Sequence, residues 1–319
     1  MHNLQSIADQ FTLGDIIDSN QLEGKINITY LIETSQKKYV IQKLSKIYDE
    51  RIVEKTHKIH ELLEGSGIQT PRLIPTNSGS YIHKEGNDLW RAYEYIENDG
   101  LQEIDVNKAE KAAKALAIFH NFTGRSNFIP QYTREEYQNL ELTLSKLRTF
   151  YADGEQFRKD LAKPIYDAIF ANIDKHRLPD NLPPKIIHAD PAFRNFLFKD
   201  NEIVAIIDLD DLMIRNHMID IGHALQSWCL KKPSEFLLDI FKVSVKSYND
   251  QSDTKYDFKL YKDALCLLAL DHAARYLNGV FEENYWEWDQ TKYEHAYEQN
   301  LERSQGRLDY YFNIINNLK

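Results

Sequence analysis

The side chains with the clearest chemical potential are those of Asp190, Asn195 and Asp208. Transfer of a phosphoryl group needs a carboxylate that accepts or orients the proton of the attacking hydroxyl. It also needs oxygen ligands for Mg²⁺, a hard cation that takes few of its ligands from protein. Asp190 suits the first task, and the amide of Asn195 with the carboxylate of Asp208 suits the second. These residue types therefore predict Mg²⁺-dependent phosphoryl transfer.

The segment between Asn195 and Asp208 has the pattern of a β-hairpin. Apolar residues 196–198 and 203–207 flank a polar turn at residues 200–201. Because the two open ends of a hairpin lie side by side, we expect Asn195 and Asp208 to come close enough to share one metal ion. In the alternative interpretation the carboxylates only cap turns and strands. It is less favoured, because it does not explain the spacing.

The pattern His188-x-Asp190-x4-Asn195, followed by an apolar hairpin and Asp208, resembles the catalytic and metal loops of the protein-kinase-like fold. It is most similar to the aminoglycoside phosphotransferase and choline kinase branch. The segments DLDDLM and IDIGHAL are similar to those of the N-acetylhexosamine 1-kinase group. This resemblance implies an ATP- and Mg²⁺-dependent kinase of small molecules, with Asp190 as catalytic base and Asn195 and Asp208 as metal ligands.

The expected strands and helices that must position these residues indicate an α+β fold with two lobes, as in protein-kinase-like enzymes. We expect residues 1–97 to form the nucleotide-binding N-lobe, a five-stranded antiparallel sheet with one long helix at 49–64. Residues 98–319 are expected to form a mainly helical C-lobe with the catalytic and metal loops and the substrate site. The expected strands are 12–17, 27–33, 38–44, 80–83 and 89–96, with a stiff connector at 71–75. The other expected helices are 3–10, 106–122, 133–150, 155–175, 221–230, 234–248, 257–278 and 292–317.

The resemblance also assigns residues that bind the nucleotide. Lys43, at the end of the third expected strand, would reach the α- and β-phosphates, and either Glu54 or Glu61 of the next helix would steady it. No GxGxxG motif is present. Gly24 is the one glycine of the first turn, so polar groups such as Thr29 and backbone N–H groups are expected to cover the phosphates. The backbone of Glu94 and Tyr95 resembles the hinge that contacts adenine.

The acceptor is less closely defined by the sequence. Asp210, Asp271 and Arg275 are candidate substrate contacts, although Asp271 and Arg275 also have the i,i+4 spacing of a helical ion pair. The resemblance favours a sugar or amino sugar, with the anomeric hydroxyl of a hexosamine first. Asp271 and the acidic composition favour a cationic alcohol such as an aminoglycoside or choline as the alternative. A non-catalytic nucleotide-binding regulator is an alternative of another class, suggested by the missing glycines.

Two further residues are expected to support the site without taking part in the chemistry. Asp220 resembles a buried aspartate that braces the catalytic loop, and His120 is interpreted as structural.

Composition excludes several other classes of protein. With 319 residues, of which 42% are hydrophobic, the chain can bury a large core. A formal net charge of −10 argues against nucleic acid or an anionic membrane as partner, and leaves a small molecule. Cys229 and Cys266 stand in apolar contexts, which favours a reducing compartment. The N-terminus has no signal pattern, and no apolar run has membrane-spanning length, so we expect a cytoplasmic protein.

Overall fold

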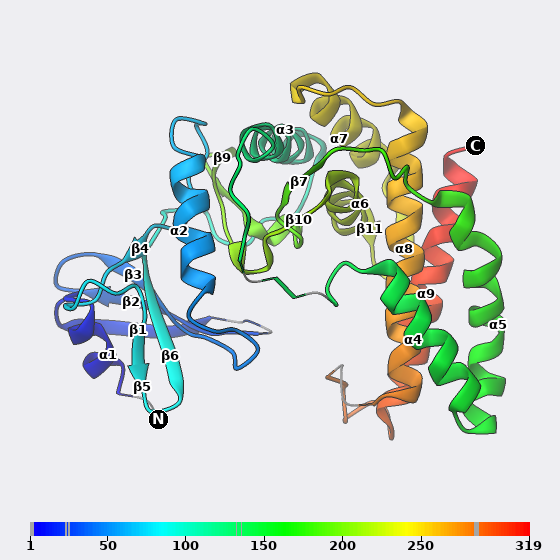
Figure 1. Ribbon diagram of the computed structural model, residues 1–319, viewed down its shortest axis with the longest axis horizontal. Coiled ribbons are helices and arrows are strands. Elements are labelled where there is room, and N and C mark those ends of the chain that lie inside the picture. Colours follow the sequence, from blue (N-terminus) through cyan, green and yellow to red (C-terminus); the bar gives the residue numbers. More distant parts are fainter. Residues whose placement is uncertain (1–2, 23, 25, 132, 135, 284–286) are drawn as a thin grey trace. The chain divides into compact units, whose positions relative to one another are not determined.

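The computed structural model describes residues 3–22, 24, 26–131, 133–134, 136–283 and 287–319, and it divides the chain into two compact units (Figure 1). The first unit contains Met1–Gln102, Asn121–Thr133 and Arg194–Met213. The second contains Glu103–His120, Arg134–Phe193 and Ile214–Lys319. The first unit thus includes the segment with Asn195 and Asp208, which the predicted boundary after residue 97 places in the C-lobe.

The first unit is built on an antiparallel sheet. Its described strands are β1 (Ile16–Leu22), β2 (Ile28–Thr34), β3 (Lys38–Lys43), β4 (Leu73–Ile74), β5 (His83–Glu85) and β6 (Asp88–Glu94). They run in the order β1-β2-β3-β6-β4, and β5 also pairs with β6. The sheet has six strands instead of the predicted five, because the expected connector 71–75 contains β4. Pro71 and Pro75 lack N–H groups, but the two residues of β4 between them can still pair.

Two helices pack on this unit's sheet. Helix α1 (Leu4–Gln10) contributes Ile7 to a core with Ile41 of β3 and Trp90 of β6. Side chains alternate along a strand, so Gln42 and Arg91, the neighbours of these two residues, leave the sheet on the other face. Helix α2 (Ile52–Leu62) contributes Lys55 and Thr56, which are buried, to the first unit.

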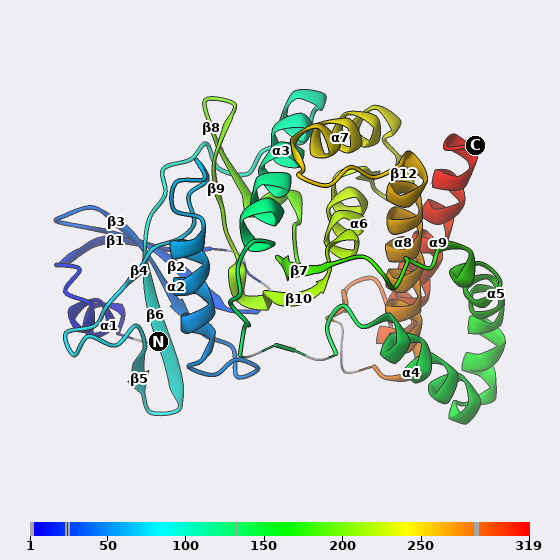
Figure 2. The same ribbon diagram turned by 45° about the horizontal axis from the view of Figure 1, so that its top comes forward.

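The predicted hairpin is confirmed as β8 (Phe196–Lys199) and β9 (Glu202–Ile206), shown in Figure 2. Asp200 and Asn201 have φ angles of 52° and 62°, which a type I′ turn requires and which Asp and Asn tolerate. Gln69 ties β9 to the first unit, since its N–H donates to Val204 O at 3.2 Å and its carbonyl accepts from Ile206 N at 3.0 Å.

The second unit is mainly helical. Helix α8 (Phe258–Phe281) packs against α4 (Leu140–Asp153), α5 (Gln156–Asn172), α6 (His217–Trp228) and α9 (Ala296–Asn317) (Figure 1). Every helix predicted from the sequence is present. The largest difference is at α4, which begins at Leu140 instead of residue 133, because the side chain of Asn139 caps it by accepting from Leu142 N.

The remaining elements of the two units are α3 (Val106–Thr123), α7 (Leu238–Gln251), β7 (Pro184–Ile187), β10 (Met213–Asn216), β11 (Leu230–Lys231), β12 (Glu235–Phe236) and the 3₁₀ turns Ile173–His176, Phe193–Asn195 and Leu209–Asp211.

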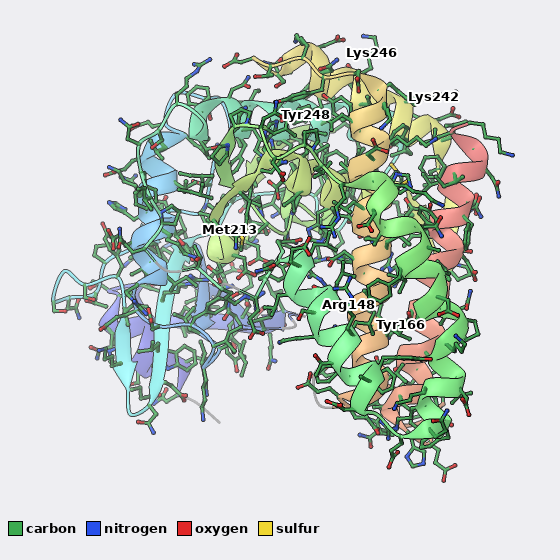
Figure 3. The ribbon with its side chains drawn as sticks, turned by 45° about the vertical axis from the view of Figure 1, so that its right-hand side comes forward. Arg148, Tyr166, Met213, Lys242, Lys246 and Tyr248 are labelled. Atoms are coloured by element: carbon green, nitrogen blue, oxygen red, sulfur yellow. The ribbon has the colours of Figure 1, made fainter. Side chains whose placement is uncertain are left out.

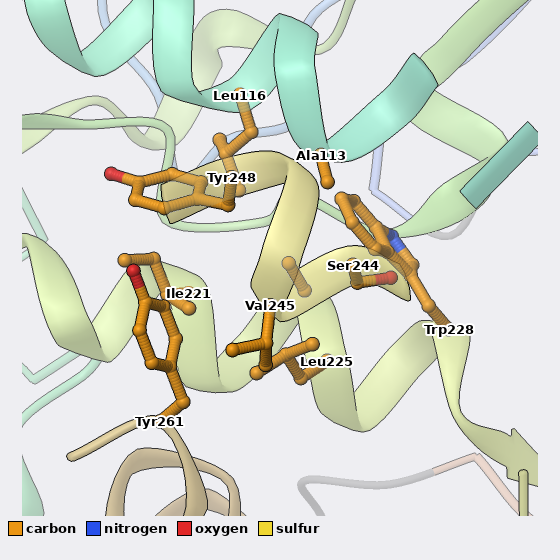
Figure 4. Close-up of a pocket in the computed structure, with 10 residues that line it drawn as sticks. Ala113, Leu116, Ile221, Leu225, Trp228, Ser244, Val245, Tyr248 and Tyr261 are labelled. Atoms are coloured by element: carbon orange, nitrogen blue, oxygen red, sulfur yellow. The ribbon is translucent and has the colours of Figure 1, made fainter. Parts of the chain in front are cut away.

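Close packing fills the helical core. Figure 4 shows Trp228, Tyr248 and Tyr261 around a void of about 10 Å³, which is too small to hold a substrate. Elsewhere in this unit, Arg148 of α4 lies over the Phe170 ring of α5, 4.7 Å from its centroid. Figure 3 labels Arg148 together with Tyr166, another residue of α5. In the described part of the chain, no helix combines the length and apolar composition needed to cross a bilayer.

Candidate active site

Asp220 of α6 holds the backbone that leads to the predicted catalytic aspartate. Its two carboxylate oxygens accept from the N–H groups of His188 and Ala189, both at 2.8 Å. The ring of His120 lies 2.9 Å from the same carboxylate, and burial lowers the pKa of His120. Burial alone would raise the pKa of Asp220, but the hydrogen bonds from His120 and the backbone outweigh it and lower that pKa. The predicted bracing role of Asp220 and the structural role of His120 are therefore confirmed.

The loop itself is bent at Ala189, which has a φ of 70°, uncommon for a residue with a side chain. Three contacts hold this peptide: the bond to Asp220, and the bonds that its carbonyl accepts from Gln138 Nε2 at 2.8 Å and His223 Nδ1 at 3.0 Å. The bend presents Asp190 with 20% of its side chain exposed.

His223 of α6 faces the predicted catalytic aspartate, with Nε2 3.9 Å from Asp190 Oδ1. Burial lowers the pKa of His223, so the ring is neutral near pH 7. Its Nδ1 carries the proton donated to Ala189 O, so Nε2 bears a lone pair. A neutral His223 therefore supports the loop without neutralising the carboxylate of Asp190.

The first unit carries the predicted metal ligands. The backbone bond from Ile207 N to Asn195 O, 2.9 Å long, closes the base of the hairpin, so Asn195 and Asp208 stand at adjacent chain ends as expected. Asp208 has a φ of 66°, and Asn195 is buried. An amide and carboxylates are the oxygen donors that Mg²⁺ prefers. Among the described residues, no group of three or more His, Cys, Asp or Glu side chains offers a competing metal site.

Asp210 joins a buried network in the same unit. Its Oδ2 accepts from Arg91 Nη2 at 2.6 Å and from Asn27 Nδ2 at 2.8 Å. Arg91 also donates through Nε and Nη2 to Gln42 Oε1, at 3.0 and 2.8 Å. Gln42 in turn donates from Nε2 to Thr29 Oγ1 at 3.0 Å. Thr29 thus orients the network. Contact between Asp210 and the substrate stays a prediction.

Lys43 is not brought to this network. It leaves β3 on the side of Trp90, its partner in the sheet, and its Nζ forms an ion pair with Asp88 Oδ2 at 2.7 Å. The pairing of Lys43 with Glu54 or Glu61 stays a prediction; Glu61 pairs with Lys58 on the exposed face of α2. Strand alternation keeps Lys43 from the network, because it puts Gln42 and Lys43 on opposite faces.

Two cations that sequence reasoning missed approach the metal loop instead. Arg91 contacts Asp210, and Lys55 of α2 donates to the Asp210 carbonyl at 2.7 Å. Both side chains are almost fully buried. The signal was present in the sequence: a charged residue inside the apolar strand 89–96 needs a buried partner of opposite charge.

The residues predicted to cover or bind the nucleotide lie in the first unit. A Cβ at Gly24 would stand 2.9 Å from Asn27 O, so the turn needs glycine there. The N–H of Glu94 already donates to Arg72 O at 3.0 Å. The hydroxyl of Tyr95 accepts from Asn98 Nδ2 at 3.3 Å. Contact of Glu94 and Tyr95 with adenine stays a prediction.

The candidate substrate residues Asp271 and Arg275 form the expected i,i+4 ion pair, 2.8 Å long, on α8. Arg275 also lines a cavity of about 310 Å³ in the second unit. The ring of Tyr137 lies 4.3 Å from the guanidinium of Arg134 and 5.6 Å from that of Arg275. The other lining residues are Glu136, Leu142, Thr143, Lys146, Asn278, Gly279 and Glu282.

Two interactions link residues at this cavity to the segment around Asp190. Gln138, next to Tyr137 in the chain, donates to the Ala189 carbonyl. Arg275 is also near enough to His223 to contribute to lowering its pKa, after the larger effect of burial. The cavity and Asp190 therefore belong to the same unit, although Asp190 is not among the residues that line the cavity.

Comparison with known proteins places the chain among phosphotransferases. Residues 21–245 match the model of the phosphotransferase enzyme family, APH. Homoserine kinase of Mesorhizobium japonicum is 24% identical over 284 residues, covering 86% of this chain and 83% of that protein. The structure of amicoumacin kinase hAmiN in complex with AMP-PNP, Ca²⁺ and Ami has a TM-score of 0.68 and 16% identity, covering 97% of this chain and 93% of that one. A microcompartment-associated aminopropanol kinase has a TM-score of 0.69 and 14% identity, covering 95% of both chains. The predicted two-part kinase-like α+β fold is confirmed.

Proposed function

Because the chain belongs to the phosphotransferase enzyme family, APH, and is a small-molecule kinase, we propose that its acceptor is a small amino alcohol. The predicted family and the prediction of an enzyme are both confirmed, so the alternative of a non-catalytic regulator falls away. The sugar acceptor that we expected first has no support among these relatives, which include homoserine and aminopropanol kinases.

Asp190 is the catalytic base in this proposal. It orients the acceptor hydroxyl and takes its proton while the hydroxyl oxygen bonds to the γ-phosphorus of ATP. The bond from that phosphorus to the β–γ bridging oxygen breaks, and ADP leaves. The observation that carries the proposal is the bent Ala189 peptide, held by Asp220, Gln138 and His223, which fixes the aspartate in place. Positioning of this kind supplies much of the catalysis in phosphoryl transfer.

Asn195 and Asp208 would hold Mg²⁺, since both supply oxygen donors at the base of one hairpin. When bound, the ion neutralises negative charge on the β- and γ-phosphates. The turn after Asp208 is itself fixed by Lys55, whose ammonium donates to the Asp210 carbonyl.

The cavity in the second unit, the unit that also carries Asp190, suits a small zwitterionic or amino-alcohol acceptor. Its volume, about 310 Å³, lies at the lower end of the range of about 300–1,000 Å³ typical of ligand pockets. A multi-ring aminoglycoside needs more room. The lining combines cations, Arg134, Lys146 and Arg275, with the acids Glu136 and Glu282. Both an amine and an anionic group therefore find partners of opposite charge.

ADP release from Mg-ATP should identify the acceptor class. The panel contains homoserine, aminopropanol, choline, an N-acetylhexosamine and an aminoglycoside. We expect turnover with the small amino alcohols, and loss of turnover when EDTA removes the divalent cation. Turnover confined to the hexosamine or the aminoglycoside would contradict the proposed acceptor while leaving the kinase activity intact.

Arg275→Met is expected to raise KM for the acceptor by about tenfold, the loss of one charge-assisted hydrogen bond, with KM for ATP unchanged. The reason is that Arg275 lines the cavity in the second unit. Steady-state kinetics with each substrate varied in turn measures KM for the acceptor and KM for ATP separately. Asp271→Asn is the matched control, because it breaks the same ion pair but keeps the guanidinium. An equal rise of the acceptor KM in both variants would show that the effect comes from loss of the ion pair, and it would contradict the proposed contact of Arg275 with the acceptor.

A further inference from the structure

The buried network around Asp210 satisfies nearly all of its polar groups within the first unit. Asn27, Gln42 and Thr29 use their side chains to hold Asp210 and Arg91 in place. Within this network, as far as the structure describes it, Arg91 Nη1 and Asp210 Oδ1 are buried and have no hydrogen-bond partner. Leaving such groups unpaired is costly, and more so for charged groups. A buried guanidinium nitrogen and a buried carboxylate oxygen that both lack a partner point to a ligand that brings anionic oxygen and a cation to this network.

We propose that Arg91 is the residue that binds the phosphate chain of ATP, through its Nη1, in the role that the sequence resemblance assigns to Lys43. This inference rests on the proposed kinase function, because it names a residue of the same nucleotide site. Asp210 is the positioning residue that holds the guanidinium by its other nitrogen, Nη2.

The first argument is position. Arg91 lies beside Gln42 in the pairing of β3 with β6, on the face of the sheet that meets the metal loop. Asp208, a proposed metal ligand, stands two residues before Asp210, whose carboxylate accepts from Arg91 Nη2 at 2.6 Å. The phosphates must lie next to the metal ion, so a phosphate-binding cation belongs beside Asp208.

The second argument is chemical type. Arginine presents donors in a rigid fork, so it can bind one carboxylate through Nη2 and offer Nη1 to another anion at the same time. Gln42 accepts from Nε and Nη2, which fixes the plane of the fork. Lys43 cannot bind two anions in this way, because lysine has no rigid fork of donors. Its ammonium is paired with Asp88 on the Trp90 side of β3. The residue next to it in the chain, Gln42, occupies the face where a phosphate-binding lysine would stand.

A purely structural role of Arg91, neutralising the buried carboxylate of Asp210, makes a different prediction. Removing the guanidinium alone leaves that carboxylate unpaired, and the protein can then fail to fold. The double variant Arg91→Gln/Asp210→Asn removes both charges and keeps two polar side chains of similar size. If the role is structural, this double variant restores nucleotide binding. If Nη1 binds phosphate, the double variant folds and still binds ATP weakly.

The test is calorimetric titration of the full chain with Mg-ATP and, separately, with adenosine. We expect Arg91→Gln/Asp210→Asn to weaken Mg-ATP binding about 10- to 100-fold and to leave adenosine binding unchanged, because only ATP carries phosphate. Asp210→Asn alone, which keeps the guanidinium, should bind Mg-ATP more tightly than the double variant. Lys43→Gln removes a cation of the same sheet from the opposite face and should bind Mg-ATP within about threefold of the wild type.

Thermal unfolding of each variant checks that it is folded before titration. A large loss of Mg-ATP binding in Lys43→Gln, with none in the double variant, would overturn the inference and restore Lys43 as the phosphate ligand. An equal loss in Asp210→Asn and in the double variant would also overturn it, because the effect would then belong to Asp210. If the wild-type protein itself fails to bind Mg-ATP, the proposed function fails, which is a distinct result from any of these.

Discussion

Replacing Asp190 by Asn is expected to lower kcat by about 10²- to 10⁴-fold, the usual contribution of a positioned general base. The change removes the proton acceptor and keeps the size of the side chain. The loop should stay folded, because its bend is held through Ala189 and His188, whose N–H groups bond to Asp220. Affinity for Mg-ATP should be retained, since the proposed nucleotide and metal contacts are made by other residues.

Two measurements separate this role from a structural one. Single-turnover phosphorylation of the acceptor reports the chemical step, and titration with Mg-ATP reports binding. Asp167→Asn is the matched control, because that aspartate lies exposed on α5 and pairs with Lys163. It should behave like the wild type. Unchanged single-turnover rates in Asp190→Asn would remove Asp190 from the mechanism, and with it most of the proposed chemistry.

Asp220→Ala is expected to lower the free energy of unfolding by about 3–5 kcal/mol. The side chain is fully buried, and its loss leaves the N–H groups of His188 and Ala189 without acceptors, together with the contact to His120. Each unsatisfied buried donor costs about 1–3 kcal/mol. Because the same bonds bend the catalytic loop, activity should fall along with stability.

The destabilisation should depend on pH in a defined direction. The folded-state pKa of Asp220 lies below its ordinary value of 3.8, so its charged form stabilises the folded protein at any pH above that value. This contribution is lost as the pH falls through the folded-state pKa, and the wild type and variant should then converge. Urea unfolding at neutral and acidic pH measures the difference. Asp250→Ala, an exposed aspartate paired with Lys246, is the control and should change stability little at either pH. A destabilisation of the same size at both pH values would show that Asp220 acts by packing and not by charge.

Local patterns in the sequence determined the hairpin, and the resemblance of its motif identified the predicted catalytic loop. The turn at Asp200 and Asn201 follows from two apolar segments flanking residues that tolerate positive φ, and it alone brings Asn195 next to Asp208. The helices followed from their apolar period, apart from the start of α4, where the cap at Asn139 decided the boundary. The bracing role of Asp220 was expected from the resemblance of its segment to that of related kinases, because the residues that it holds, His188 and Ala189, are distant in the sequence. The hairpin and the helices, in contrast, depend on residues that are close in the sequence.

Only the tertiary structure decided which cation meets the metal loop and where the cavity lies. Gln42, Arg91 and Asp210 come from three distant segments, and strand alternation says only that Gln42 and Lys43 face opposite ways. The face of the sheet that Asp210 reaches depends on how the turn after Asp208 packs against α2, where Lys55 donates to the Asp210 carbonyl. That contact leaves no periodic signal in the sequence. Likewise the cavity lies where residues of α4 and α8 meet, so Arg275 lines it as well as forming an ion pair with Asp271. Contacts between distant segments are set by packing and by the pairing of buried charges, which no local pattern encodes.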